Sequence, residues 1–103
     1  MNKVAVRTHG GEQWVWYYCP GCKELHGVPA KRWNWNGDLE LPTLHPSVRH
    51  YHVQPDTNQQ ITHCHYHVKG GVIEFCDDCP HELKGQKVEL QEPTAQASVP
   101  DDS

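Results

Sequence analysis

The chain has 103 residues, enough for one domain, and its hydrophobic content of 36% with a mean hydropathy of −0.80 predicts a thin core. Nine Lys and Arg against thirteen Asp and Glu give a net charge of −4, which argues against nucleic acid as a partner. No apolar stretch reaches the length of a membrane span and no signal peptide opens the chain, so the sequence predicts a cytoplasmic protein without a membrane partner.

Strand periodicity recurs along the chain and predicts a mostly β fold of small antiparallel sheets. Gly70-Gly71 between two β-rich runs is typical of a two-residue hairpin turn. We expect one domain over residues 1–92, a short helical turn at most over 79–84, and a disordered tail over 93–103, which lacks periodicity. The expected strands cover residues 4–8, 12–18, 32–35, 47–53, 61–68, 71–75 and 87–90.

Two Cys-x-x-Cys knuckles are the clearest chemical signal. Cys19 and Cys22 form the first pair and Cys76 and Cys79 the second, and each pair follows a predicted strand. Two such pairs supply the four thiolates of a closed tetrahedral zinc site, which is structural rather than catalytic. The five cysteines are an odd number, so a fully paired disulfide framework does not fit, and zinc is the expected cofactor.

Histidines offer alternative ligands for this zinc. His26 follows Cys22 by four residues, and His81 follows Cys79 by two, so either imidazole is placed to enter the metal shell. Cys64 alternates with histidines in the predicted strand 61–68, where it is expected on the core face. If that strand pairs with 47–53, five imidazoles share one face of a sheet, which is either a metal or pH-sensing surface or a polar exterior.

A proline-rich segment and two tryptophans suggest a recognition pocket. Thr43 and Ser47 lie around Pro42 and Pro46, while Trp33 and Trp35 share one face of a short segment, as either core wall or exposed cage. Ser47 as a nucleophile needs a histidine base and an acid. His65, His81, Asp77 and Asp78 are available, but no Gly-x-Ser-x-Gly motif surrounds Ser47, and the sequence does not favour this chemistry.

Taken together, several motifs resemble one family of short phage and bacterial proteins of unknown function that are often mislabelled ammonia monooxygenase. They are Trp33-Asn-Trp35, Pro42-Thr-Leu-His-Pro-Ser47, Cys64-His65, Gly71-Val-Ile-Glu-Phe-Cys76-Asp-Asp78-Cys-Pro-His81 and Leu83-Lys-Gly85-Gln86-Lys-Val88-Glu-Leu90. The resemblance spans Trp14 to Leu90. The ammonia monooxygenase label has no support here, since the chain holds no membrane span.

The resemblance implies recurring positions at Thr43, Ser47, Cys64, His65, Asp78, His81 and Gly85. It also implies that residue 79 varies between Cys and Ser, which favours His65 and His81 as alternative zinc ligands. Some members occur beside genes for bacterial ubiquitin-like conjugation, which by analogy implies a role in handling protein modification. In architecture the chain is also similar to β-tent folds, in which two zinc knuckles pin two antiparallel sheets.

Two classes of function are consistent with these observations. The first is a phage accessory protein that binds a host or phage protein through its Trp and His face, with structural zinc. The alternative is a zinc hydrolase of the peptidase or amidase kind, in which His65, His81 and one Asp or Cys hold a metal with an open position, and Asp78 or Glu74 is the general base.

Overall fold

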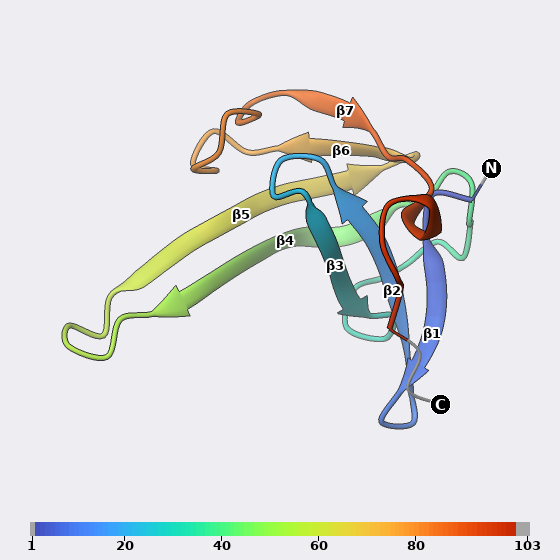
Figure 1. Cartoon of the computed structure of the whole chain (residues 1–103), viewed down its shortest axis with the longest axis horizontal. Coiled ribbons are helices and arrows are strands. Elements are labelled where there is room, and N and C mark those ends of the chain that lie inside the picture. The colour runs from blue at the N-terminus through green and yellow to red at the C-terminus, as the bar shows by residue number, and fades with distance from the viewer. Residues whose placement is uncertain (1, 101–103) are drawn as a thin grey trace.

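The computed structural model describes residues 2–100 and consists of two antiparallel sheets (Figure 1). The first has the order β1-β2-β3 and the second the order β4-β5-β6-β7. Within the described residues, a single 3-10 turn is the only helical element, so the predicted mostly β fold is confirmed. The strands are β1 (Ala5–His9), β2 (Glu12–Cys19), β3 (Glu24–Pro29), β4 (Leu44–Val53), β5 (Gln60–Lys69), β6 (Val72–Phe75) and β7 (Lys87–Glu89).

The core lies between the two sheets. Tyr17 on β2 and Tyr66 on β5 are fully buried, and their hydroxyl oxygens are 2.6 Å apart, which ties one sheet to the other. Burial raises the pKa of both phenols, so each stays protonated and able to donate a hydrogen bond. Cys64 and Val68 flank Tyr66 on the same buried face of β5, as the alternation in the sequence predicted.

The turn at Gly70 and Gly71 confirms the predicted hairpin. Both residues have positive φ, 56° and 82°, a conformation that glycine adopts without steric cost and that a two-residue turn of this kind requires. The turn joins β5 to β6, with Lys69 opposite Val72. It therefore sends β6 back along β5 and into the second knuckle.

One predicted strand is absent from the structure, and one observed strand was not predicted. Residues 32–35 form turns and irregular backbone rather than a strand, because the backbone N–H groups of Arg32 and Trp33 donate to the carbonyl of Pro29 in a turn. The strand Glu24–Pro29 was not predicted, since Gly27 interrupts its pattern. Residues 79–84 contain a turn but no helix.

The C-terminal segment begins with the 3-10 turn η1 (Pro93–Ala95), in which Pro93 is buried. The expected disorder over 93–103 stays a prediction for the remainder, and residues 101–103 lie outside the described part of the chain. No helix in the described residues is long and apolar enough to cross a membrane.

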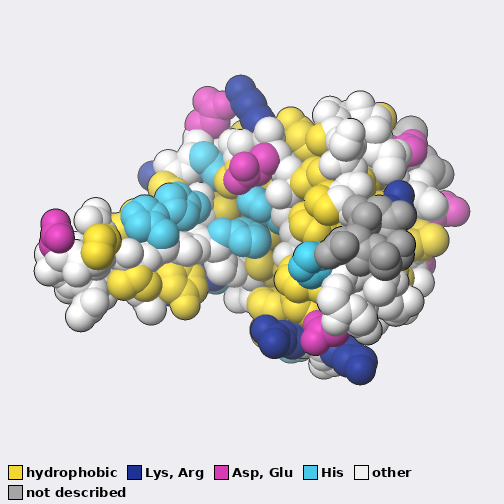
Figure 2. All heavy atoms as spheres, turned by 60° about the horizontal axis from the view of Figure 1, so that its bottom comes forward, with side chains coloured by type: hydrophobic (Ala, Val, Ile, Leu, Met, Phe, Trp, Pro, Cys, Tyr) yellow, Lys and Arg dark blue, Asp and Glu magenta, His cyan; other side chains and the backbone are white. Residues whose placement is uncertain are grey.

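The β4–β5 hairpin projects well beyond the other strands (Figure 1). We call its projecting part, residues 50–63, the arm. The space-filling view shows histidine and hydrophobic side chains side by side along the arm (Figure 2). Both strands are ten residues long, whereas β6 has four, so much of the hairpin has no further strand beside it.

Candidate functional site

Three side chains that are remote in sequence meet at the base of the arm. The Ser47 Oγ on β4 lies 3.3 Å from His65 Nε2 on β5. His65 Nδ1 lies 2.9 Å from one carboxylate oxygen of Asp78 and 3.1 Å from the other. A histidine that bridges a hydroxyl and a carboxylate through its two ring nitrogens has the geometry of a Ser-His-Asp catalytic triad.

Local structure explains how the three residues converge. The β4–β5 ladder is irregular between Leu44 and Val48, and Ser47 lies in this irregular stretch. The backbone N–H of Cys76 donates to the carbonyl of His65 at 2.9 Å, which holds the end of β6 beside His65. Asp78 sits in the turn that follows, so its carboxylate reaches the imidazole.

The electrostatics of the group suit this arrangement. The hydrogen bond from His65 lowers the pKa of Asp78, so the carboxylate is ionised at neutral pH and able to stabilise a positive imidazole. The His65 side chain is 24% exposed and that of Asp78 is 62% exposed, so the group is accessible from solvent.

Trp33 contacts the backbone of Ser47. Its indole N–H donates to the carbonyl of Ser47 at 3.2 Å. Trp35, the other predicted recognition residue of this segment, instead donates to the carbonyl of Asp38 at 3.3 Å. Thr43 Oγ1 accepts the N–H of Gly70 at 2.9 Å, so this hydroxyl supports the β5–β6 turn.

A cluster of sulfur and nitrogen donors lies beside the triad. Cys19, Cys22, His26 and Cys64 bring their ligand atoms within 4.8 Å of one another. Cys19 Sγ and Cys64 Sγ are 3.8 Å apart, close to the separation of about 3.8 Å that two thiolates have on a tetrahedral zinc with Zn–S bonds of about 2.3 Å. His26 is buried, and its Nε2 has no hydrogen-bond partner in the described structure. This donor set fits a metal such as zinc.

A second donor group shares Cys64 with the first. Cys64, Cys79 and His81 place their ligand atoms within 4.8 Å, with His81 Nε2 at 3.4 Å from Cys64 Sγ and 3.1 Å from Cys79 Sγ. The two knuckles approach closely here, because a Cβ added to Gly21 would lie 2.2 Å from the His81 ring. Glycine is therefore needed in the first knuckle for His81 to pack against it.

The sulfurs of this group influence one another's ionisation. The hydrogen bond from Cys64 lowers the pKa of Cys19, and the same bond, together with burial, raises the pKa of Cys64. Burial also raises the pKa of Cys22. One thiolate thus suppresses ionisation of its neighbours, and a bound divalent cation relieves this repulsion.

The predicted set of four thiols does not form one group. Cys19 and Cys22 lie with His26 and Cys64, and Cys79 lies with Cys64 and His81. Cys76 instead lies with His65 and Asp78, all three ligand atoms within 4.8 Å. The alternates His26, Cys64 and His81 thus take part in the cluster, whereas His65 belongs to the triad.

The histidines do not share one face of the β4–β5 hairpin, contrary to the sequence-based expectation. The register pairs His50 with Cys64 and Arg49 with His65, so His50 faces the core side and His65 the opposite side. His50 stacks on His26 at 4.0 Å, and burial lowers its pKa to about 4. His52 and His63 meet on the arm, with ring nitrogens 2.5 Å apart.

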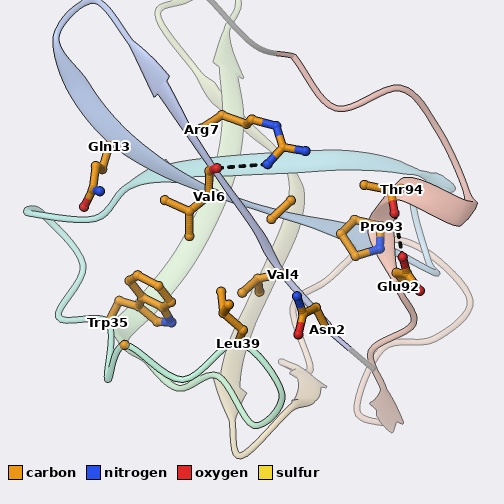
Figure 3. A pocket seen from close by; sticks show the side chains of 12 residues that line it. Asn2, Val4, Val6, Arg7, Gln13, Trp35, Leu39, Glu92, Pro93 and Thr94 are labelled. Atoms are coloured by element: carbon orange, nitrogen blue, oxygen red, sulfur yellow. Dashed lines mark hydrogen bonds between the residues drawn. The ribbon is translucent and has the colours of Figure 1, made fainter. Parts of the chain in front are cut away.

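A cavity of about 470 Å³ lies away from this site (Figure 3). It is bounded by β1, the segment with Trp35 and Leu39, and the turn with Pro93. None of Ser47, His65 and Asp78 lines it. Trp35 lines this cavity, but Trp33, Thr43 and Ser47, which the sequence analysis places in the same recognition pocket, do not.

Sequence analysis considered Ser47 as a nucleophile with His65 or His81 as base and Asp77 or Asp78 as acid, but it did not favour this set, because no local motif surrounds Ser47. The structure brings Ser47, His65 and Asp78 together from three separate elements. A signal for this arrangement was present in the sequence. In Cys64-His65 and in Asp78-Cys79, a cysteine that can bind a metal is adjacent to one of the triad residues.

A protein-family model described as "Bacterial ubiquitination-like system serine protease (BubE)" matches residues 1–76. The matched part includes Ser47, His65, Cys19, Cys22 and Cys64, and it ends before Asp78. Comparison with curated proteins and with solved structures found no match.

Proposed function

The chain belongs to the bacterial ubiquitination-like system serine protease (BubE) family, and on that premise we propose that it is a serine protease with Ser47 as its nucleophile. The observation that carries the proposal is His65, which lies within hydrogen-bonding reach of both Ser47 and Asp78. The order Ser-His-Asp along the chain differs from the orders in chymotrypsin, subtilisin and the α/β-hydrolases, which agrees with recognising a triad by geometry rather than by sequence position.

The residues have distinct roles in this chemistry. Ser47 Oγ attacks the carbonyl carbon of the scissile bond while His65 Nε2 takes its proton. The protonated His65 then gives that proton to the leaving amine, and the resulting acyl-serine ester is hydrolysed by water with His65 again as base. Asp78 accepts the Nδ1 hydrogen bond throughout, which orients the ring and stabilises its positive form.

The metal in this proposal is zinc, and its role is structural. Cys64 precedes His65 and Cys79 follows Asp78, so ligands from the cluster flank two of the three triad residues. Zinc bound by sulfur-rich sites of this kind holds backbone segments in place. Zinc binding at Cys64 and Cys79 would thus hold His65, the base, and Asp78, the acid, within reach of each other.

The substrate in this proposal is a protein of a bacterial ubiquitination-like system, which follows from the family description. The protein-binding role expected from the sequence is then recognition of this substrate. A phage origin is supported by the sequence resemblance alone.

A metal hydrolase is the second candidate function. It is favoured by the group of His65, Cys76 and Asp78, whose ligand atoms lie within 4.8 Å at the surface. Three protein ligands leave a coordination position for water, as catalytic zinc sites require. In that case Ser47 would be dispensable.

One matched pair of variants separates the two functions. The full-length chain purified with its metal is incubated with a fluorophosphonate probe, which labels activated serines, and with p-nitrophenyl acetate. For the serine protease, Ser47→Ala abolishes labelling and hydrolysis, while Cys76→Ser retains both. Hydrolysis that persists in Ser47→Ala and disappears in Cys76→Ser would refute the serine mechanism in favour of the metal hydrolase.

A further inference from the structure

The nucleophile of the proposed triad lies on an edge strand. The sheet order is β4-β5-β6-β7, so β4 pairs with β5 on one side and has no strand on the other. Figure 1 shows β4 along one border of the projecting hairpin. Unpaired backbone groups along such an edge are a ready template for an additional strand.

Hydrogen bonds at the two ends of β4 show which residues direct their backbone groups outward. Asn34 N–H donates to the carbonyl of His45 at 2.8 Å, and the Trp33 indole donates to the carbonyl of Ser47. At the other end, Gln54 N–H donates across the hairpin to the carbonyl of Gln59. Backbone direction alternates along a strand, so odd-numbered residues face the open edge and even-numbered residues face β5.

The open edge therefore begins just beyond Ser47. Its outward residues are Arg49, Tyr51 and Val53, and in the described structure no hydrogen bond outside the β4–β5 ladder involves their backbone groups. Before them, the carbonyls of His45 and Ser47 are already occupied. An added strand would be stopped at Ser47 by these contacts.

Side chains beside this edge form an ordered surface on the face of Ser47. Residues two apart on a strand share a face, so Arg49 and Tyr51 lie on the same side as the nucleophile. The Arg49 guanidinium lies over the Tyr51 ring at 4.9 Å, and its Nε donates to Thr62 Oγ1 at 2.9 Å. Tyr51 and Val53 are 49% and 48% exposed, although both are large hydrophobic residues.

We propose that the free edge of β4 from Arg49 to Val53 binds an extended peptide segment of the substrate as an added antiparallel strand that ends at Ser47. This inference rests on the proposed function. An antiparallel peptide runs from the tip of the arm toward Ser47, so the docked residues precede the scissile bond. Five residues of edge correspond to about 17 Å of extended chain at about 3.4 Å per residue.

This mode of binding divides affinity and selectivity between two kinds of contact. The backbone groups of the edge bind any extended chain without proline at the paired positions, whereas alternate side chains of the peptide meet Arg49 and Tyr51. Aromatic and β-branched side chains pair well with an exposed tyrosine across a strand. We therefore expect a preference for such residues at alternate positions before the cleaved bond.

The test measures binding without turnover. A phage-displayed library of random ten-residue peptides is selected on the metal-loaded, full-length Ser47→Ala variant. A recovered peptide is added to the ¹⁵N-labelled variant, and amide hydrogen exchange is followed by NMR. We expect hydrogen exchange of the Arg49 and Tyr51 amides to slow at least tenfold. When backbone nitrogens of the peptide are methylated one at a time, binding should be lost only for methyl groups at alternate positions.

Two substitutions at one position separate the backbone contact from the side-chain contact. With Ser47→Ala as background, Tyr51→Pro removes an outward N–H and should weaken peptide binding at least tenfold, whereas Tyr51→Thr keeps that N–H and should retain most of it. Thermal unfolding of both variants shows whether each is folded, and the N-methyl scan gives the same answer without altering the chain.

Three outcomes overturn the inference. The selection yields no binding peptide, or the peptide protects amides elsewhere in the chain. In the third outcome, the edge amides of the free chain become protected as its concentration rises, which would show that a second copy pairs with the edge.

Failure of the protease proposal has a different signature. Wild-type chain that neither reacts with a fluorophosphonate nor hydrolyses p-nitrophenyl acetate would refute it, whatever the result of the exchange experiment.

Discussion

Replacing Trp33 by Phe tests whether the contact between its indole and the Ser47 carbonyl positions the nucleophile. The substitution removes the 3.2 Å hydrogen bond but keeps an aromatic ring against the core. One hydrogen bond contributes about 0.5–1.5 kcal/mol to stability. For a domain of this size, about 1 kcal/mol corresponds to a fall in Tm of about 4–8 °C.

Trp35→Phe is a matched control, because Trp35 also packs partly buried against the core and donates to a backbone carbonyl, that of Asp38, away from Ser47. Both variants should lose similar stability. Only Trp33→Phe should lower kcat for p-nitrophenyl acetate, by about fivefold for 1 kcal/mol and up to about 100-fold if Ser47 moves by about 1 Å.

Thermal denaturation and steady-state kinetics of both variants provide the measurement. Equal losses of Tm with unchanged kcat in both would contradict a positioning role for Trp33. An equal fall of kcat in both would also contradict it, since the effect would then come from general destabilisation rather than from the contact with Ser47.

Three further predictions concern the cluster and His50. Removing metal with a chelator should reduce near-UV dichroism and fluorophosphonate labelling together, because Cys64 and Cys79 of the cluster are adjacent to His65 and Asp78. Labelling that survives complete metal removal would contradict this prediction. Gly21→Ala should lower zinc affinity at least tenfold in a chelator competition, since its Cβ would overlap the His81 ring; unchanged affinity would show that His81 is not a ligand. Burial lowers the pKa of His50 to about 4, so below about pH 6.5 the unfolded chain binds a proton that the folded chain does not, and stability falls as pH drops toward 4. His50→Gln should reduce this fall in Tm, and an identical pH profile would refute the assignment.

Much of the fold was predictable because its signals are local. The alternation in residues 61–68 placed Cys64 and Tyr66 in the core, and Gly70-Gly71 marked a hairpin, since strand periodicity and positive φ depend on neighbouring residues only. The segment around Trp33 was predicted as a strand and is irregular. Its side-chain N–H bonds to Ser47, a residue 14 positions away, and local propensity carries no information about that contact.

The site was predictable as a list of residues but not as an arrangement. The sequence by itself determined most of the strands, the Cys19-x-x-Cys22 pair and the presence of serine, histidine, aspartate and sulfur ligands. Only the tertiary structure decided that Cys64 and His81 lie with cysteines of the two knuckles while Cys76 lies apart with His65 and Asp78, and that His65 bridges Ser47 and Asp78. The physical reason is that strand register, an irregular ladder beside Ser47 and the turn after β6 set these distances, and each depends on long-range backbone pairing.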